Sequence, residues 1–351
     1  MAFMPGQLQT LMPWAVAASS AVFGETELAA RLPSALAMLG MSLTGLVFGA
    51  RWFGRVGGLA AGLATVLTPL FWSSGRSAEI ETLNNFATCA SVLLVLDMLL
   101  IRGRSAAGTV IAAGLLAVSL VLAALAKGPA GFAAIGSAAR GGLILGRGQK
   151  TGRGAWWVLI AALAAGLSIG LIAGFIDRAV TASGQHPITQ GVSEFLWSGR
   201  PMTPTAIGQV VAMAPVALAT LLPVSLALLF PWGPDARREA ARDAEAASAH
   251  RWARALAWTC LLSLALLTAL GVHNPRYAIP SLCFIPVLAA YVSWGARGGF
   301  MPLRARIARA LLLGRGWAWP AVLAVGAAVY IGWFEPRQRA TSGLEAGRSL
   351  G

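Results

Sequence analysis

Charged side chains that could do chemistry occur in four short stretches, each of which contains or borders proline or glycine. Arg and Lys donate charge-assisted hydrogen bonds to phosphate, and a nearby carboxylate can act as a general base or orient a second substrate. Proline and glycine stop or bend helices and leave backbone N–H groups free to bind an anion. The stretches contain Arg31 with Pro33, Arg76 with Glu79 and Glu81, Lys127 with Gly128 and Pro129, and His273 with Asn274, Pro275 and Arg276.

The elements that must position these residues are apolar helices. The chain is 57% hydrophobic and 11% charged, whereas soluble domains carry about 25% charged residues. Crossing about 30 Å of hydrocarbon takes about 20 apolar residues, and only helices satisfy the backbone there, so we predict an all-α polytopic membrane protein with about 10 transmembrane helices. The predicted spans are 33–50, 56–73, 82–101, 106–125, 129–146, 155–176, 205–230, 252–271, 277–296 and 310–332.

The connectors between these spans alternate between strongly and weakly basic. The basic set holds most of the 27 Lys and Arg residues, and the positive-inside rule places it in the cytoplasm. Both termini and the four chemistry-bearing stretches then lie at the outer face. This topology explains the net charge of +14, and we predict no nucleic-acid partner. The basic connectors run from Arg51 to Arg55, Arg102 to Arg104, Arg147 to Arg153, Arg237 to Arg254, and Arg297 to Arg309.

We predict a single transmembrane domain over residues 1–351. Its first part lacks the positive start of a signal peptide, while Trp14 and Phe23 suit a helix lying at the interface. We therefore expect that a span upstream of this segment is missing from the reading frame. The predicted segments outside the spans are an outer interfacial segment (1–32), an outer loop (177–204), a cytoplasmic loop forming a solvated helix (232–251) and an outer tail (333–351).

Few ionisable residues fall inside the predicted spans. Asp97 and Arg140 lie near cytoplasmic ends, where we expect their side chains to snorkel. Charges at the membrane midplane mark ion relays and transport paths, and this pattern places charge at the outer boundary instead. Such an arrangement suits a substrate with a lipid tail and a charged head. The other interpretation is that these residues are interfacial anchors of ordinary helices.

Five motifs in the same order resemble one known family. The run from Phe23 to Ser34 (FGETELAARLPS) matches an FG-x-x-E-x-x-x-R-LPS signature. It resembles bacterial polyprenyl-phosphate-sugar glycosyltransferases, which include the lipid A aminoarabinose transferases (ArnT-like) and relatives of the protein O-mannosyltransferases. The other four motifs are Arg76 to Glu81, Lys127-Gly128-Pro129, Ser193 to Trp197, and Pro275-Arg276-Tyr277 followed by Ile279-Pro280.

The resemblance implies a GT-C membrane fold and inverting sugar transfer at the outer, periplasmic face of the bacterial inner membrane. The donor is a polyprenyl phosphate sugar, and the acceptor is a lipid, glycan or protein. An acceptor hydroxyl or phosphate attacks the anomeric carbon, and cations stabilise the leaving polyprenyl phosphate. The resemblance assigns Glu81 to catalysis, Lys127, Arg276, His273 and Arg76 to the donor phosphate, and Arg31, Glu27, Glu194 and Tyr277 to structure or the acceptor side.

The sequence departs from the family at its start. The principal catalytic carboxylate of the family lies in a first outer loop that has no counterpart here, and the Lys-Pro-Pro that follows it appears as Met4-Pro5-Gly6. The expectations are a reading frame that starts late, a fragment or an inactive relative. Two alternative functions stay open, a non-catalytic membrane subunit and a transporter or flippase of a lipid-linked molecule.

The resemblance implies an activity that requires no cofactor. A divalent metal at the outer loops is a weaker hypothesis, because His186 and His273 have no HxxxH-type spacing. Cys89, Cys260 and Cys283 lie in apolar stretches without a CxxC pair, and we predict that they are small core residues.

Overall fold

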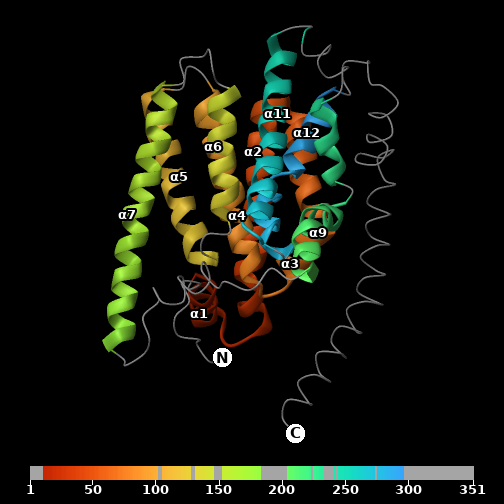
Figure 1. Ribbon diagram of the computed structural model, residues 1–351. Coiled ribbons are helices and arrows are strands. Elements are labelled where there is room, and N and C mark those ends of the chain that lie inside the picture. The colour runs from red at the N-terminus through yellow and green to blue at the C-terminus, as the bar shows by residue number, and fades with distance from the viewer. Residues whose placement is uncertain are drawn as a thin grey trace.

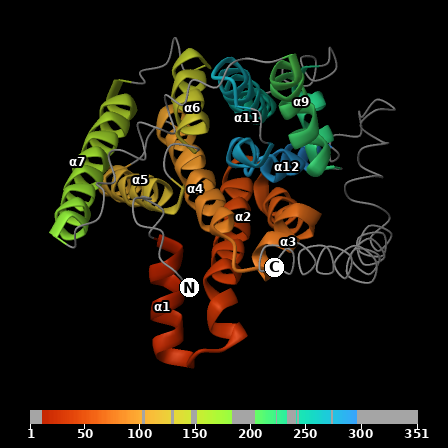
Figure 2. The ribbon, with the colours of Figure 1, turned by 60° about the horizontal axis from the view of Figure 1, so that its bottom comes forward.

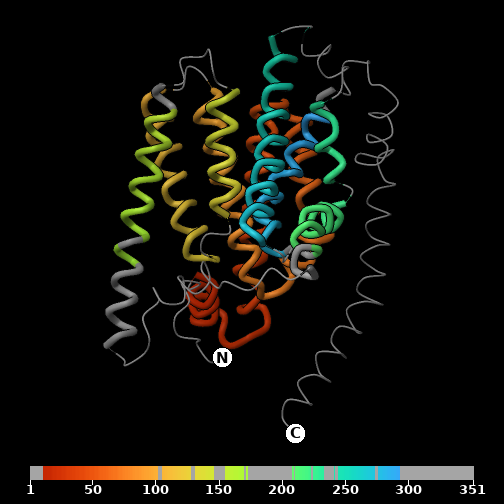
Figure 3. Tube along the Cα trace, in the orientation of Figure 1, coloured from red at the N-terminus to blue at the C-terminus, as the bar shows by residue number. Residues whose placement is uncertain are grey.

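The computed structural model of this chain is a bundle of helices, most of which run side by side (Figure 1). It describes residues 11–101, 105–127, 131–145, 152–182, 204–222, 224–232, 241, 244–272 and 275–295 (Figure 3). Within these ranges the regular structure consists of α-helices and short 3₁₀ helices, without β-strands. The predicted all-α class is therefore confirmed.

The first helix, α1 (Leu11–Phe23), lies across one end of the bundle. It is seen nearly end-on in Figure 1 and side-on in Figure 2. The chain then reverses at Gly24, whose φ of 73° is readily adopted by glycine. Thr26 caps the next helix, because its hydroxyl oxygen accepts a hydrogen bond from the Ala29 N–H at 3.2 Å. This placement fits the interfacial helix predicted within residues 1–32.

The second element, α2 (Glu27–Leu67), consists of two helical arms that fold back on each other at Gly54. The Gly54 backbone has φ 77° and ψ 172°, which is not helical. A β-carbon added to Gly58 would lie 2.6 Å from the Ala50 β-carbon and 2.6 Å from the Leu46 carbonyl oxygen. Glycine therefore permits the close approach of the arms. The arms correspond to the predicted spans that begin at residues 33 and 56, although the second arm ends early and α3 (Pro69–Arg76) follows.

Four further helices match predicted spans. The central one is α4 (Ile80–Leu100), which packs against α2, α5 and α6. After it come α5 (Ala106–Lys127) and α6 (Phe132–Leu145). At the edge of the bundle α7 (Gly152–Ala182) packs mainly against α5 (Figure 1). Of these four, α4 and α5 are long and apolar enough to cross a membrane, whereas the apolar parts of α6 and α7 within the described residues are shorter.

The predicted span 205–230 is wrong as a single straight helix. It is divided into α9 (Pro204–Thr220) and the 3₁₀ helix η2 (Val224–Trp232), which differ in direction by 105°. The sequence has Pro223 between them, and proline lacks the N–H needed to continue a helix.

The long helix α11 (Ala244–Ala269) begins inside the predicted cytoplasmic loop 232–251. Ala246, Ala249 and His250 are buried, and His250 Nδ1 lies 3.1 Å from the Tyr291 hydroxyl. Residues 244–251 are helical as predicted, and Ala244 and Glu245 are exposed, but the helix is not solvated all round. Small alanines at helical spacing give this stretch one face that packs on the bundle.

The predicted span 277–296 is divided by proline into η3 (Pro275–Tyr277), η4 (Ile279–Ser281) and the short helix α12 (Pro286–Gly295). Described side chains of α12 from Val287 to Val292 are all buried, and α12 packs against α2, η2 and α11. This segment is therefore a core element enclosed by other helices. The predicted span 310–332, the tail 333–351 and residues 183–203 of the outer loop lie outside the described residues.

Large apolar side chains are exposed on the outward faces of three helices. They recur at helical spacing, and a water-soluble protein seldom exposes patches of this extent. Among the described residues, α2, α4, α5 and α11 are long and apolar enough to cross a membrane, and the bent pair of α9 and η2 could form a fifth span. The exposed residues include Leu36, Leu39, Leu43 and Val47 of α2, Ile111, Leu115 and Val118 of α5, and Leu163, Leu167 and Leu171 of α7.

Asp97 is buried near the end of α4, where snorkelling was predicted. Its Oδ1 accepts a hydrogen bond from Trp52 Nε1 at 3.0 Å and lies 3.2 Å from Arg51 Nε. Trp52 also stacks on Trp252 of α11, with ring centroids 4.0 Å apart. The snorkelling prediction is therefore wrong for Asp97, because the turn of α2 brings partners to the carboxylate. The carboxylate thus joins α4 to α2, and the Trp52–Trp252 stack joins α2 to α11.

Replacing Asp97 with alanine is expected to lower the free energy of unfolding by about 2 kcal/mol, the usual worth of a charge-assisted hydrogen bond. The measurement is the midpoint of thermal unfolding in detergent. Arg55→Ala is the matched control, because Arg55 follows the same turn but is exposed. Equal midpoints for the two variants would show that the Asp97 contacts do not stabilise the fold.

Candidate functional site

Side-chain contacts bring together the start of α4, the end of α5 and the 3₁₀ helix η3, and α1 packs against α5. Glu81 is the second residue of α4, and Lys127 is the last residue of α5. Lys127 Nζ donates a hydrogen bond to Glu81 Oε1 at 2.9 Å. The side chains are 7% and 16% exposed, respectively, so this ion pair is largely shielded from solvent and stronger than a surface pair.

The 3₁₀ helix η3 brings two more side chains to this pair. Lys127 Nζ lies 4.8 Å from the centre of the Tyr277 ring, a distance typical of a cation–π interaction. Arg276 interacts electrostatically with Glu81. We call Glu81, Lys127, Arg276 and Tyr277 the charged cluster. It combines two cations with one carboxylate, and therefore has a net charge of +1 that favours an anion.

Local sequence explains why these side chains meet. Gly128 and Pro129 follow Lys127 in the sequence, and this pair ends helices. The first turn of α4 is fixed to α3, because the Thr82 hydroxyl donates to the Ser74 carbonyl at 3.0 Å. The Ser34 hydroxyl donates to the Glu79 carbonyl at 3.2 Å and fixes the preceding connection to α2.

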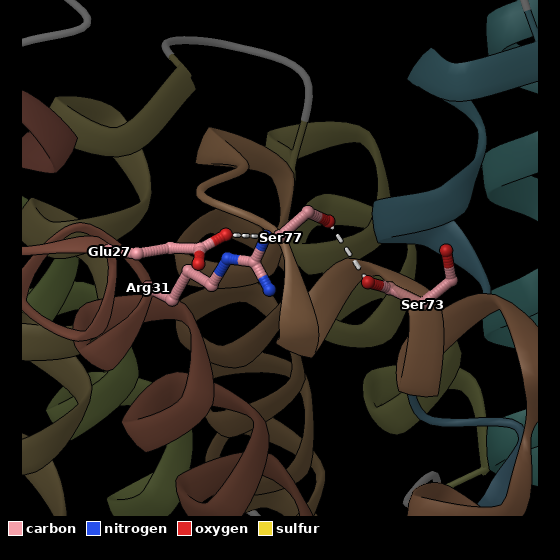
Figure 4. A network of polar contacts seen from close by, with 4 residues as sticks. All are labelled: Glu27, Arg31, Ser73 and Ser77. Atoms are coloured by element: carbon pink, nitrogen blue, oxygen red, sulfur yellow. Dashed lines mark hydrogen bonds and ion pairs between the residues drawn. The ribbon is translucent and has the colours of Figure 1, made fainter. Parts of the chain in front are cut away.

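Other predicted site residues make their described contacts elsewhere. The Arg76 guanidinium lies 5.9 Å from the ring centre of Trp72 on its own helix, α3. Arg31 forms an exposed ion pair with Glu27 one turn before it on α2 (Figure 4). The close-up also shows the Ser77 hydroxyl donating to the Ser73 carbonyl. These contacts do not join Arg76, Arg31 or Glu27 to the charged cluster.

His273 and Glu194 lie outside the described residues. Within the described residues, no three His, Cys, Asp or Glu side chains are grouped so that they could hold a metal ion. Cys89, Cys260 and Cys283 are buried with free thiols, which confirms their prediction as core residues.

Three further polar residues on α4 were not predicted as site residues from the sequence. Asn84, Asn85 and Thr88 are buried in a helix that was treated only as an apolar span. The available signal was their spacing, because they follow Glu81 by three, four and seven residues and so share its face of the helix. The charged cluster therefore continues into the bundle as a polar stripe.

The sequence matches no protein-family model and no curated protein. Two solved structures are similar in fold, both of ArnT from Cupriavidus metallidurans. The apo structure has a TM-score of 0.54 and 18% sequence identity, over 82% of this chain and 50% of that chain. The structure bound to undecaprenyl phosphate has a TM-score of 0.55 and 16% identity, over 83% of this chain and 52% of that chain.

This chain thus spans about half of the length of the solved proteins that it matches. The match extends over most of the present chain, and it agrees with the exposed apolar side chains of α2, α5 and α7. The chain is therefore a multi-pass membrane protein with an ArnT-like fold, as the resemblance of its five motifs led us to expect.

Proposed function

We propose that this protein is a membrane glycosyltransferase that takes a sugar from a polyprenyl phosphate donor and passes it to a lipid, glycan or protein acceptor. The observation that carries the proposal is the charged cluster, in which Lys127 is hydrogen-bonded to Glu81 and Arg276 interacts with Glu81 electrostatically. An ArnT-like fold supports the same function, since one ArnT structure holds undecaprenyl phosphate. The proposed location is the bacterial inner membrane, with the cluster on the periplasmic face.

The two cations provide the donor site in this proposal. A lipid phosphate arriving at the end of the bundle competes with Glu81 for Lys127 and gains Arg276 as a second partner. Charge-assisted hydrogen bonds to phosphate are about twice as strong as neutral ones. The polyprenyl chain then lies along the exposed apolar side chains of the bundle, which suits its hydrocarbon character.

Transfer of the sugar requires one bond to form and one to break at the anomeric carbon. The acceptor hydroxyl gives its proton to Glu81, which the phosphate has released from Lys127, and the acceptor oxygen bonds to the anomeric carbon. The bond from this carbon to the phosphate oxygen breaks, and the electron pair leaves with the polyprenyl phosphate. Lys127 and Arg276 stabilise the negative charge that develops on this leaving group.

The proposal is tested by lipid binding to the full chain in nanodiscs. Undecaprenyl phosphate is expected to bind at least ten times more tightly than undecaprenol, because only the phosphate uses the two cations; this is about 1.4 kcal/mol. Equal binding of the two lipids would refute the donor site. A second assay follows sugar release from undecaprenyl phosphate glycosides, and movement of the intact lipid across the membrane without release would favour a transporter.

A further inference from the structure

The face of α4 that carries Glu81 continues into the bundle as a row of polar side chains. Asn84, Asn85 and Thr88 follow Glu81 at helical spacing and lie within about one third of the helix circumference. At 1.5 Å per residue, the row extends about 5 to 10 Å beyond Glu81 along the helix axis. This length is comparable to that of one sugar ring.

These side chains have unsatisfied polar atoms. Asn84 is 0% exposed, and neither its amide nitrogen nor its amide oxygen has a hydrogen-bond partner among the described residues. The same is true of the Asn85 amide oxygen and the Thr88 hydroxyl. Most buried polar groups are paired, and unpaired ones destabilise a fold. Three neighbouring exceptions therefore indicate that these atoms are retained for a partner that is bound only at times.

Elements packed against α4 also carry features suited to a polar partner. Ser281 of η4 is 0% exposed, and its hydroxyl has no hydrogen-bond partner in the described part of the chain. η4 packs against α4. At the start of α6, Gly131 approaches the Thr88 hydroxyl so closely that an added β-carbon would collide with it. In the ligand-free protein the backbone at Gly131 therefore packs closely against this hydroxyl without forming a hydrogen bond to it.

We propose that Asn84, Asn85, Thr88 and Ser281 form the subsite for the sugar ring of the lipid donor; this inference rests on the proposed function. Amides and hydroxyls both donate and accept hydrogen bonds and carry no charge, which suits the hydroxyl groups of a sugar. The phosphate is held at Lys127 and the ring lies next to it, along α4.

The ion pair between Glu81 and Lys127 closes this subsite in the ligand-free protein. The pair lies at the start of the row and is itself largely buried, and the polar atoms behind it are packed against protein. Entry of the sugar therefore requires Lys127 to leave Glu81, which is the same change that phosphate binding produces. Phosphate binding and sugar binding are consequently coupled, and a free sugar without the lipid phosphate binds poorly.

The test uses the full chain in nanodiscs with Asn84→Leu and Thr88→Val, which keep side-chain size and remove hydrogen-bonding atoms. The probes are undecaprenyl phosphate and the same lipid carrying glucose, mannose or 4-amino-4-deoxyarabinose. For the wild type we expect at least one glycosylated form to bind at least tenfold more tightly than the bare lipid. In the variants, the ratio of the affinity for this glycosylated lipid to the affinity for the bare lipid is expected to fall at least tenfold. The affinity for undecaprenyl phosphate itself should change less than twofold.

Thermal unfolding of the variants without lipid provides the second measurement, and the midpoint should be unchanged or higher because unpaired polar atoms have been removed. Ser91→Ala is the matched control, since Ser91 is buried on α4 but bonded to Ser119. Three results would each overturn the sugar subsite. The first is an affinity ratio of glycosylated to bare lipid that is unchanged in the variants, and the second is an equal loss of affinity for both lipids. The third is a wild type that binds the glycosylated lipids no more tightly than the bare lipid. If the wild type binds none of these lipids, the proposed function itself fails.

Discussion

Lys127→Ala is expected to weaken binding of undecaprenyl phosphate by about 10- to 150-fold, or about 1.5–3 kcal/mol. Lys127 Nζ is the most shielded cation of the charged cluster, so its hydrogen bond to phosphate competes less with water than a surface contact does. The measurement is the dissociation constant of the lipid in nanodiscs. Arg31→Ala is the control, because Arg31 is paired with Glu27 and exposed, and we expect less than a twofold change.

Loss of the lysine also leaves the Glu81 carboxylate without its hydrogen bond, which could destabilise the end of the bundle. Lys127→Gln separates the two effects, because glutamine can still donate a hydrogen bond to Glu81 but carries no charge. We expect the glutamine variant to unfold at nearly the wild-type temperature and to bind the lipid as weakly as the alanine variant. Normal lipid affinity in a folded Lys127→Gln protein would remove Lys127 from the donor site.

Glu81→Gln is expected to lower the turnover of sugar transfer by about 100-fold, the lower limit for the loss of a general base. The glutamine amide oxygen can still accept a hydrogen bond from Lys127. It cannot take the proton from the hydroxyl group of the substrate that receives the sugar. Binding of undecaprenyl phosphate should be equal or tighter, because the negative charge next to the phosphate is gone. The measurement is turnover and donor affinity determined on the same preparation.

This separation of turnover from affinity distinguishes a base from a structural carboxylate. Replacing a carboxylate that only positions Lys127 would lower donor affinity together with turnover. The control is Glu27→Gln, which alters an exposed carboxylate at the same end of the bundle. Unchanged turnover in Glu81→Gln would exclude Glu81 as the general base.

The meeting of Glu81 with Lys127 and Arg276 could be predicted from the sequence. Two consecutive spans run antiparallel, so the start of the first lies at the same end of the bundle as the end of the second. The topology alone therefore places Glu81, at the start of α4, near Lys127, at the end of α5. The motifs then pointed to the right connectors. Arg76 shows the limit of this argument, because sharing one end of the bundle does not determine which way a side chain turns.

Residues inside the spans could not be assigned in the same way. The partners of Asp97, Arg51 and Trp52, come from α2 just before its turn at Gly54. Hydropathy contains no information on which helices are neighbours. The polar stripe on α4 was hidden for a related reason. Hydropathy averaged over the whole span shows only that the span is apolar. It does not show that Asn84 and Thr88 lie together on one face of the helix.

The enclosure of α12 has a consequence for biogenesis. This helix has 10 residues, too few to cross the hydrocarbon alone, and it is covered by α2 and neighbouring helices. We therefore expect that α12 does not insert into the bilayer as an independent span. It packs only after the earlier helices, which are synthesised first, have assembled around its position. Arg276 and Tyr277 belong to the segment just before α12. The charged cluster is therefore completed only when this last part of the described chain has been synthesised.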